Sequence, residues 1–280
     1  MRIAAFGDIH SNSHAFRACL DRAEEIGIDA CVLLGDYVSD CAYPERTVDI
    51  MHEIMHRYPA YVVRGNREEY LLNHKNKHSS DWTYNSRTGS LLYTYDNLSS
   101  SALDYFASLP ISAVVTIPGE APFEIAHGSF SKSRGMLLPG HPDAESAFRE
   151  MSTGYLLCAH THTRFLMESE GKLIANGGVI GIPSSGDLQA GFLILESKSG
   201  KWFVSFENAD YDRGLVIREI IESGLINKAP VWARGIIASL KTGNDYCLNI
   251  IRLVESYSRE TGLYMDDESL WEKAAKTLGI

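Results

Sequence analysis

Short apolar runs alternate with amphipathic segments in the N-terminal part of the chain. The runs are typical of buried strands and cover residues 2–6, 30–34 and 60–63. Between them, residues 14–27 and 44–58 place apolar side chains at helical spacing. Gly27 ends the first of these helical patterns, and Pro44 lies at the start of the second. This alternation predicts a layered α/β fold in which strands pack between helices.

The pattern changes at about residues 73–110, where the chain becomes polar, serine-rich and aromatic. Residues 100–109 form one helical pattern within this segment, which begins at serines and stops at Pro110. An excursion of this length between two core segments predicts an inserted helical lid or rim rather than a linker. Three aromatic side chains in it either stack on a base or aryl group of a ligand or pack within the fold: Trp82, Tyr84 and Tyr93.

Strand patterns dominate the next part of the chain. They cover residues 111–117, 123–127, 155–160, 164–169, 172–176, 190–197 and 201–207. Four amphipathic helical patterns follow, two of them closed by glycine. We therefore expect a domain at 1–208, which carries the lid insertion, and a helical C-terminal extension at 209–280. The extension is expected to pack against this domain or to form a homo-oligomer.

Charge and composition narrow the class of protein. The formal net charge is −10, and clustered Lys and Arg are what a nucleic-acid surface requires, so no stable nucleic-acid binding is expected. A small phosphate ligand remains compatible, because a bound cation reverses the local charge. No apolar run approaches the ~20 residues of a membrane span, and no secretion signal is recognised. Five cysteines without metal-binding spacing complete the expectation of a cytoplasmic protein.

Five apolar runs end at side chains that can bind metal ions. These side chains are Asp8, His10, Asp36, Asn66, His127, His160 and His162. Because ligands bind at the carboxyl edge of strands in open α/β sheets, we expect the seven donors to meet there. Singly, each pattern is typical of a turn or of a core histidine, but the ordered set favours a metal site. Mixed carboxylate and imidazole donors favour Mn, Fe or Zn over Mg or Ca.

Seven donors are enough for two adjacent divalent ions if one carboxylate is shared. Asp36 is the best candidate for the shared ligand, because it is the only carboxylate among the donors in the middle of the order. A pair of ions of this kind suits the hydrolysis of phosphate esters.

The motifs GDIH (7–10), GDYV (35–38), GNRE (65–68), AHGS (126–129) and AHTH (159–162) resemble those of the calcineurin-like metallophosphoesterases. The resemblance covers about residues 1–207, and NGGVIGIP at 176–183 is similar to a segment of small bacterial phosphodiesterases of this family. It implies a four-layer αββα sandwich and two divalent metal ions, with manganese expected first and iron or zinc as alternatives.

The resemblance also implies a role for each donor. The first ion would be held by Asp8, His10 and His162, the second by Asn66, His127 and His160, and Asp36 would bridge them. A metal-bridging hydroxide would attack phosphorus in line with the leaving oxygen.

Arg67 departs from the family pattern, since many members have a histidine there that acts as general acid or phosphate ligand. A guanidinium is a poor proton donor but a good fork for phosphoryl oxygens. Our hypothesis is that Arg67, with Asn66, binds the substrate phosphate, and that a reactive leaving group departs with help only from water or metal. The alternative is a surface salt bridge from Arg67 to Glu68 or Glu69.

The sequence therefore predicts a dinuclear metal-dependent phosphoesterase whose catalytic residues include Asp36, Arg67 and His127. Phosphodiesters or nucleotide-type substrates are favoured, because the lid is expected to narrow the cleft. Two alternatives remain open. One is a catalytically silent metal-binding scaffold or partner-binding module, and the other is a phosphomonoesterase or protein phosphatase.

Overall fold

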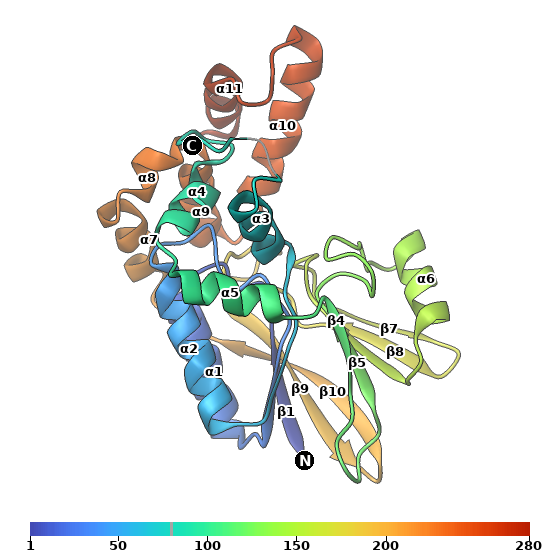
Figure 1. The fold of residues 1–280 in the computed structure, drawn as a ribbon. Helices are drawn as coiled ribbons and strands as arrows, with labels where there is room; N and C mark the ends of the chain where they lie inside the picture. Colours follow the sequence, from blue (N-terminus) through green and yellow to red (C-terminus); the bar gives the residue numbers. More distant parts are fainter. Residues whose placement is uncertain (79–80) are drawn as a thin grey trace.

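The computed structural model describes residues 1–78 and 81–280, which contain two five-stranded sheets stacked face to face (Figure 1). The first sheet contains β1 (Arg2–Phe6), β2 (Ala30–Leu33), β3 (Ala60–Val62), β9 (Ala190–Lys198) and β10 (Lys201–Ala209). The second contains β4 (Ser112–Val115), β5 (Phe123–Ala126), β6 (Tyr155–Cys158), β7 (Phe165–Ser169) and β8 (Lys172–Asn176). Their strand orders are β10-β9-β1-β2-β3 and β4-β5-β6-β8-β7.

The central strands of both sheets are parallel, and this is what gathers the loops after them. β1 pairs in parallel with β2, and β2 with β3, while β5, β6 and β8 form the parallel set of the second sheet. Carboxyl ends of parallel neighbours lie at the same edge of a sheet. The loops after β1, β2, β3, β5 and β6 therefore meet on one side of the molecule.

Helices cover the outer faces of both sheets and complete the four-layer αββα sandwich predicted from the sequence (Figure 1). α1 (Ser13–Ile26) and α2 (Pro44–Arg57) pack on the first sheet, and α6 (Pro142–Glu150) packs on the second. Gly27 ends α1 with a φ of 83°, and Pro44 begins α2, as the sequence indicated.

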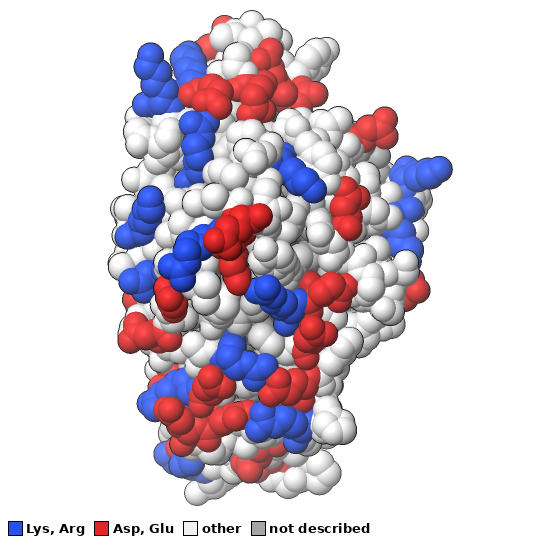
Figure 2. Space-filling view, turned by 90° about the vertical axis from the view of Figure 1, so that its left-hand side faces the viewer, with Lys and Arg blue, Asp and Glu red and all other residues white. Residues whose placement is uncertain are grey.

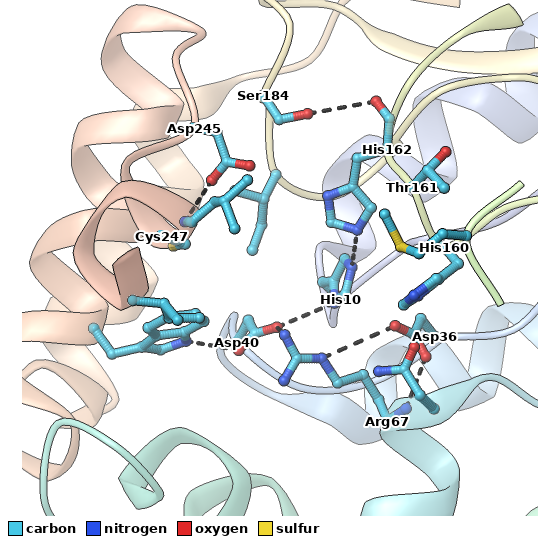
Figure 3. Close-up of a pocket in the computed structure, with 16 residues that line it drawn as sticks. His10, Asp36, Asp40, Arg67, His160, Thr161, His162, Ser184, Asp245 and Cys247 are labelled. Carbon is cyan, nitrogen blue, oxygen red and sulfur yellow. Dashed lines mark hydrogen bonds and ion pairs between the residues drawn. The ribbon is translucent and has the colours of Figure 1, made fainter. Parts of the chain in front are cut away.

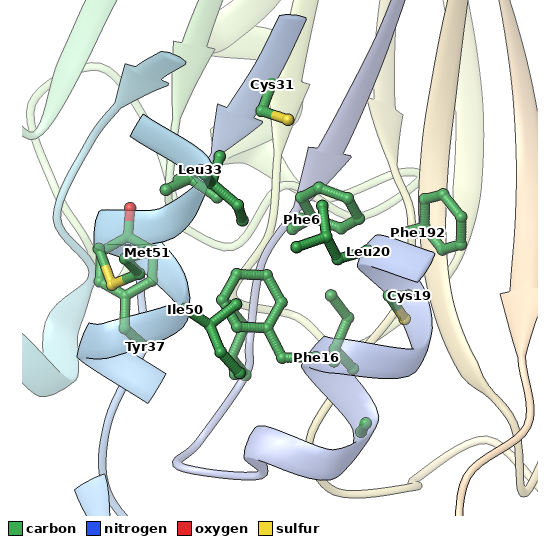
Figure 4. Packing of buried hydrophobic residues seen from close by; sticks show 14 of the residues in the cluster. Phe6, Phe16, Cys19, Leu20, Cys31, Leu33, Tyr37, Ile50, Met51 and Phe192 are labelled. Atoms are coloured by element: carbon green, nitrogen blue, oxygen red, sulfur yellow. The ribbon is translucent and has the colours of Figure 1, made fainter. Parts of the chain in front are cut away.

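Apolar side chains on both faces of β1 explain its continuous hydrophobic run. Ala4 and Phe6 belong to the core under the helices, whereas Ile3 and Ala5 belong to the core between the sheets. The Phe6 ring packs against Phe16 of α1 and Phe192 of β9, with ring centroids 5.7 and 5.3 Å apart (Figure 4).

The segment after β3 contains three helices: α3 (Asn66–Lys75), α4 (Gly89–Asp96) and α5 (Ser100–Ser108). The inserted segment is helical, as expected, but its described residues do not line the site pocket, so its role as a lid stays a prediction. Within the segment, α4 packs on the short C-terminal helix α8 (Leu225–Lys228), and a Cβ on Gly89 would collide with the Lys228 carbonyl oxygen. The segment braces the C-terminal helices.

The aromatic side chains of this segment pack within the fold and do not face the pocket. Trp82 stacks on His74 with ring centroids 4.1 Å apart. Tyr93 is buried in the core of the C-terminal helices, and the Lys228 ammonium lies 4.7 Å from the ring centroid of Tyr84. None of the three lines the pocket, although Tyr84 is 43% exposed, so the structure supports their packing role and not a role as stacking platforms for a ligand.

The remaining C-terminal helices are α7 (Arg213–Glu222), α9 (Pro230–Thr242), α10 (Tyr246–Thr261) and α11 (Glu268–Leu278). They share a core that includes Ile236, Ile250 and Trp271, and Cys41 and Ile182 from the rest of the chain join it. The extension therefore packs against the sandwich; the domain division at residue 208 stays a prediction. Within the described ranges, every helix is too short or too polar to cross a membrane.

Acidic and basic side chains are interspersed over the face drawn in Figure 2. Ion pairs also join neighbouring helices, such as Arg57 of α2 with Glu24 of α1 at 2.7 Å. Exposed pairs of this kind each add little to stability.

Candidate metal centre

The seven predicted donors lie together at the carboxyl edge of the two sheets. Ligand atoms of Asp8, His10 and His162 all lie within 4.8 Å of one another, and so do those of Asp8, Asp36 and His127. The Asn66 Oδ1 atom lies 3.1 Å from His127 Nε2, and the His160 ring centroid lies 5.3 Å from that of His127. Loops from five strands thus bring residues separated by up to 154 positions into one cluster.

Left-handed backbone conformations are concentrated in these loops. Positive φ angles between 51° and 67° occur at Asp8, His10, Asp36, His160 and His162. Asp and His tolerate this region better than most residues, but it still costs free energy that the surrounding fold must offset. Such strain at functional positions is typical of sites whose side-chain directions matter.

Glycine next to two of the donors permits close backbone approach. Gly35 has a φ of 93°, and a Cβ there would lie 2.4 Å from the Gly65 nitrogen. A Cβ on Gly65 would in turn collide with the Asp36 carboxylate and amide. Both glycines therefore allow Asp36 and Asn66 to occupy adjacent loops, as the glycines before the donors suggested.

Hydrogen bonds at the far nitrogen fix two of the imidazole rings. His127 Nδ1 donates to the Leu34 carbonyl oxygen at 2.8 Å, which turns Nε2 toward Asn66 and the Asp36 Oδ1 atom 3.4 Å away. His10 Nδ1 lies 3.1 Å from Asp40 Oδ2, which turns its Nε2 toward His162 Nε2 at 3.0 Å. Outer partners of this kind are typical of metal-binding histidines.

The residues present fit a pair of divalent cations. The Asp8 Oδ2 atom is buried and lacks a hydrogen-bond partner among the described residues, and a buried, unpaired carboxylate oxygen is costly without a cation. Both clusters of ligand atoms share Asp8, whereas the sequence favours Asp36 as the shared ligand. Asp36 lies with Asp8 in one of them, so the bridging role of Asp36 stays a prediction.

Mutual electrostatics shift the pKa values of these groups. Burial raises the pKa of Asp8 to about 6. Burial would also raise the pKa of Asp36, but the charge and hydrogen bond of His127, together with the charges of His10 and Arg67, outweigh it and hold that pKa below its usual range. The Asp36 carboxylate correspondingly raises the pKa of His127 to about 9 against its burial. Burial lowers the pKa of His160 to about 4, which keeps that imidazole neutral and able to coordinate.

Glu68 holds the two adjacent loops together from behind. Its carboxylate accepts hydrogen bonds from the backbone amides of Gly65 at 2.7 Å and of Asp36 and Tyr37 at 2.9 Å. The side chain is fully buried. It is therefore not available for the surface salt bridge that was the alternative for Arg67.

Arg67 points along the site instead, between two carboxylates (Figure 3). Its Nη2 atom lies 3.1 Å from Asp40 Oδ2, and its Nε atom lies 3.9 Å from Asp36 Oδ2. Its backbone amide donates to Asp36 Oδ1 at 2.8 Å. Glu69 is engaged elsewhere, by the Ser133 hydroxyl at 2.5 Å and by Arg64 at 3.7 Å.

A pocket of about 270 Å³ opens in front of the donors. One wall carries His10, Asp36, Asn66, Arg67, His160 and His162. The opposite wall belongs to the C-terminal extension and contains Trp232, Asp245, Cys247, Leu248 and Ile251. Sequence reasoning missed this wall, because nothing in an amphipathic helix pattern indicates which sheet edge it faces. It also missed Asp40, although a second carboxylate four residues after Asp36 was a usable signal.

A family model described as the calcineurin-like phosphoesterase superfamily domain matches residues 1–200. The chain belongs to this superfamily. Membership supports a phosphoric ester hydrolase, and divalent metals are typical of this superfamily. An uncharacterized protein from Methanocaldococcus jannaschii is 25% identical over 246 residues, which cover 82% of this chain and 94% of that protein.

Two solved structures share the fold of this phosphoesterase. A hypothetical protein from Pyrococcus horikoshii aligns with a TM-score of 0.73 and 22% identity over 87% of this chain and 99% of its own. A metallophosphoesterase from Sphaerobacter thermophilus aligns with a TM-score of 0.65 and 22% identity over 87% of this chain and all of its own. Because 87% of this chain is more than the 208 residues of the predicted domain, each alignment must include part of the C-terminal extension.

Proposed function

We propose that the protein is a dinuclear metal-dependent phosphodiesterase. The observation that carries the proposal is the convergence of two donor clusters, which share one buried aspartate, beside a guanidinium in a single pocket. Asp8, His10 and His162 would hold one ion, Asn66, His127 and His160 the other, and Asp36 would be shared. Manganese is the metal we would supply first, with iron and zinc as alternatives that accept the same donors.

The bound ions would lower the pKa of a coordinated water and offset charge on the phosphoryl oxygens. The chain's own residues would orient the substrate. Arg67 lines the pocket with Asn66 beside it, so its guanidinium and the Asn66 amide can bind a phosphoryl oxygen. Asp36 and His127 lie 3.4 Å apart and would keep that end of the site rigid.

A diester fits the pocket better than a monoester. Arg67 is the only Lys or Arg side chain among the described residues that line the pocket, and a monoester dianion would bring more negative charge. The far wall offers Ile182, Leu248 and Ile251 to a second ester group. Asp245 on the same wall disfavours substrates that carry further phosphates, because like charges repel.

Turnover of bis(p-nitrophenyl) phosphate by the full chain loaded with manganese tests the proposal. We expect release of p-nitrophenol with a higher kcat/KM than for p-nitrophenyl phosphate, and loss of turnover in Asp36→Asn, whose geometry is nearly unchanged. Faster monoester hydrolysis would indicate a phosphomonoesterase. Bound metal without turnover of either ester would favour the silent scaffold.

A further inference from the structure

The Asp40 side chain makes several hydrogen bonds and ion pairs next to the site, although it is not one of the seven candidate metal ligands. It is 1% exposed and carries a positive φ of 68°. Its Oδ2 atom lies 3.1 Å from both Arg67 Nη2 and His10 Nδ1 and accepts from the Ser39 hydroxyl at 2.9 Å. A buried carboxylate with this many donors has a fixed direction.

The other oxygen of Asp40 is held by two segments distant in sequence. The indole N–H of Trp232, which lies 192 positions further along the chain in α9, donates to Asp40 Oδ1 at 2.8 Å. The Ser90 hydroxyl of α4 donates to the same oxygen at 3.3 Å and accepts a hydrogen bond from the Asp40 backbone amide at 3.1 Å. Both the extension and the inserted helices therefore contact the carboxylate that pairs with Arg67.

Arg67 lies between two competing carboxylates. It is 3.1 Å from Asp40 and 3.9 Å from Asp36, and Asp36 is the residue assigned to both metal ions. A guanidinium drawn onto Asp36 would compete with those ions and would turn away from a substrate phosphate. An Asp40 fixed on the other side keeps Arg67 extended along the pocket with its remaining N–H groups free for phosphoryl oxygens.

We propose that Trp232, acting through Asp40, is a positioning residue that holds Arg67 in its phosphate-binding orientation. The inference rests on the proposed phosphoesterase function and extends it, because it makes the helical extension a working part of the site. A fragment of the fold without α9 would keep every metal ligand and still bind phosphate poorly.

The chain offers a matched control for a test of Trp232. Trp271 also donates its indole N–H, to the Met265 carbonyl oxygen at 2.7 Å, and is 2% exposed in the same core. Its ring packs edge-on against Trp232 with centroids 6.4 Å apart. Trp232→Phe and Trp271→Phe therefore remove similar ring volume and a similar buried donor, but only the first touches Asp40.

Kinetics on bis(p-nitrophenyl) phosphate at saturating manganese supply the first readout. We expect Trp232→Phe to raise KM about tenfold with a smaller change in kcat, since a charge-assisted hydrogen bond is lost and uniform phosphate binding weakens. Trp271→Phe is expected to keep KM within about twofold even where it lowers Tm equally. Equal KM values in the two variants would overturn the proposal.

Calorimetry with inorganic phosphate on the manganese-loaded protein supplies a readout that needs no turnover. Phosphate affinity is measured for Trp232→Phe, Arg67→Ala and the double variant. We expect Trp232→Phe to weaken phosphate binding about tenfold alone but to add little once Arg67 is alanine, because both act through one interaction. Additive losses would overturn the proposal, and so would phosphate affinity that no variant changes.

The same measurements separate this inference from the proposed function. Coupled phosphate binding without turnover of any ester would contradict the phosphoesterase but support the Trp232–Asp40–Arg67 arrangement. Turnover of an ester without coupling between the Trp232 and Arg67 variants would support the phosphoesterase and contradict the Trp232–Asp40–Arg67 arrangement. If Trp232→Phe does not fold, Ser90→Ala replaces it. This change removes a hydroxyl that is hydrogen-bonded to both the carboxylate and the backbone amide of Asp40, and it predicts the same KM increase and the same coupling.

Discussion

Arg67 shows how one side chain can set the substrate range of a site. It follows Asn66 at the position where the resemblance leads one to expect a histidine, and the structure pairs it with Asp40 and not with a neighbouring glutamate. The guanidinium stays protonated near neutral pH, and its pKa is raised further because the Asp40 and Asp36 carboxylates outweigh its burial. We therefore expect Arg67 to bind phosphate well but to be a poor proton donor to a leaving alkoxide.

Arg67→His tests that reading. An imidazolium can protonate a leaving oxygen. For an alkyl ester such as methyl p-nitrobenzyl phosphate, we therefore expect kcat to rise about tenfold relative to kcat for an aryl ester. KM should rise for both esters, because the shorter histidine side chain loses the ion pair with Asp40. Arg67→Gln is the control, since glutamine cannot donate such a proton. An unchanged alkyl-to-aryl ratio would show that proton donation does not limit the reaction.

Helices and strands were largely predictable from hydrophobic periodicity, but the partners of some of them were not. The run at residues 2–6 and the helix ended by Gly27 follow from local sequence, because their apolar faces and caps are encoded there. The packing of α4 was not predictable, because its partner, α8, lies about 130 residues further on and no local signal marks that contact. The grouping of the seven candidate donors was predictable for the opposite reason, since they lie in the loops that directly follow five strands; their role as metal ligands stays a prediction.

Gly89→Ala tests the docking of α4 on the extension. The new Cβ would meet the Lys228 carbonyl oxygen, which is backbone and cannot rotate away, so α4 and α8 must separate. We expect the free energy of unfolding in urea to fall by about 1–3 kcal/mol. Gly154→Ala is the matched control, because its Cβ would have no atom within 4 Å. Equal stability of the two variants would mean that the helices do not pack this closely.

The whole molecule buries an unusual concentration of charge at its sheet edge. Asp8, Asp36 and Asp40 are each no more than 2% exposed, and the pKa of Asp8 is raised because its charge is desolvated. A buried carboxylate without sufficient compensation destabilises the folded state. Divalent ions that bind only the folded chain would relieve this cost and add stability by mass action.

Chelation of the protein should therefore lower its Tm, and manganese should restore it. At a metal concentration about a hundred times Kd, the gain is about 2.7 kcal/mol. Asp8→Asn should be at least as stable as the unmodified chain in chelator, because it removes a buried charge whose Oδ2 atom lacks a described partner. The same variant should gain almost nothing from manganese. A Tm that is equal with and without metal would contradict the dinuclear site.

One wall of the pocket comes from α9 and α10, which lie beyond the residues that the family model matches. The candidate metal ligands and this wall therefore lie in different parts of the chain. Substitutions at Leu248 or Ile251 can reshape the volume offered to an ester group without touching a residue assigned to metal. The shape of this wall can thus change while the candidate metal ligands of the sandwich stay the same.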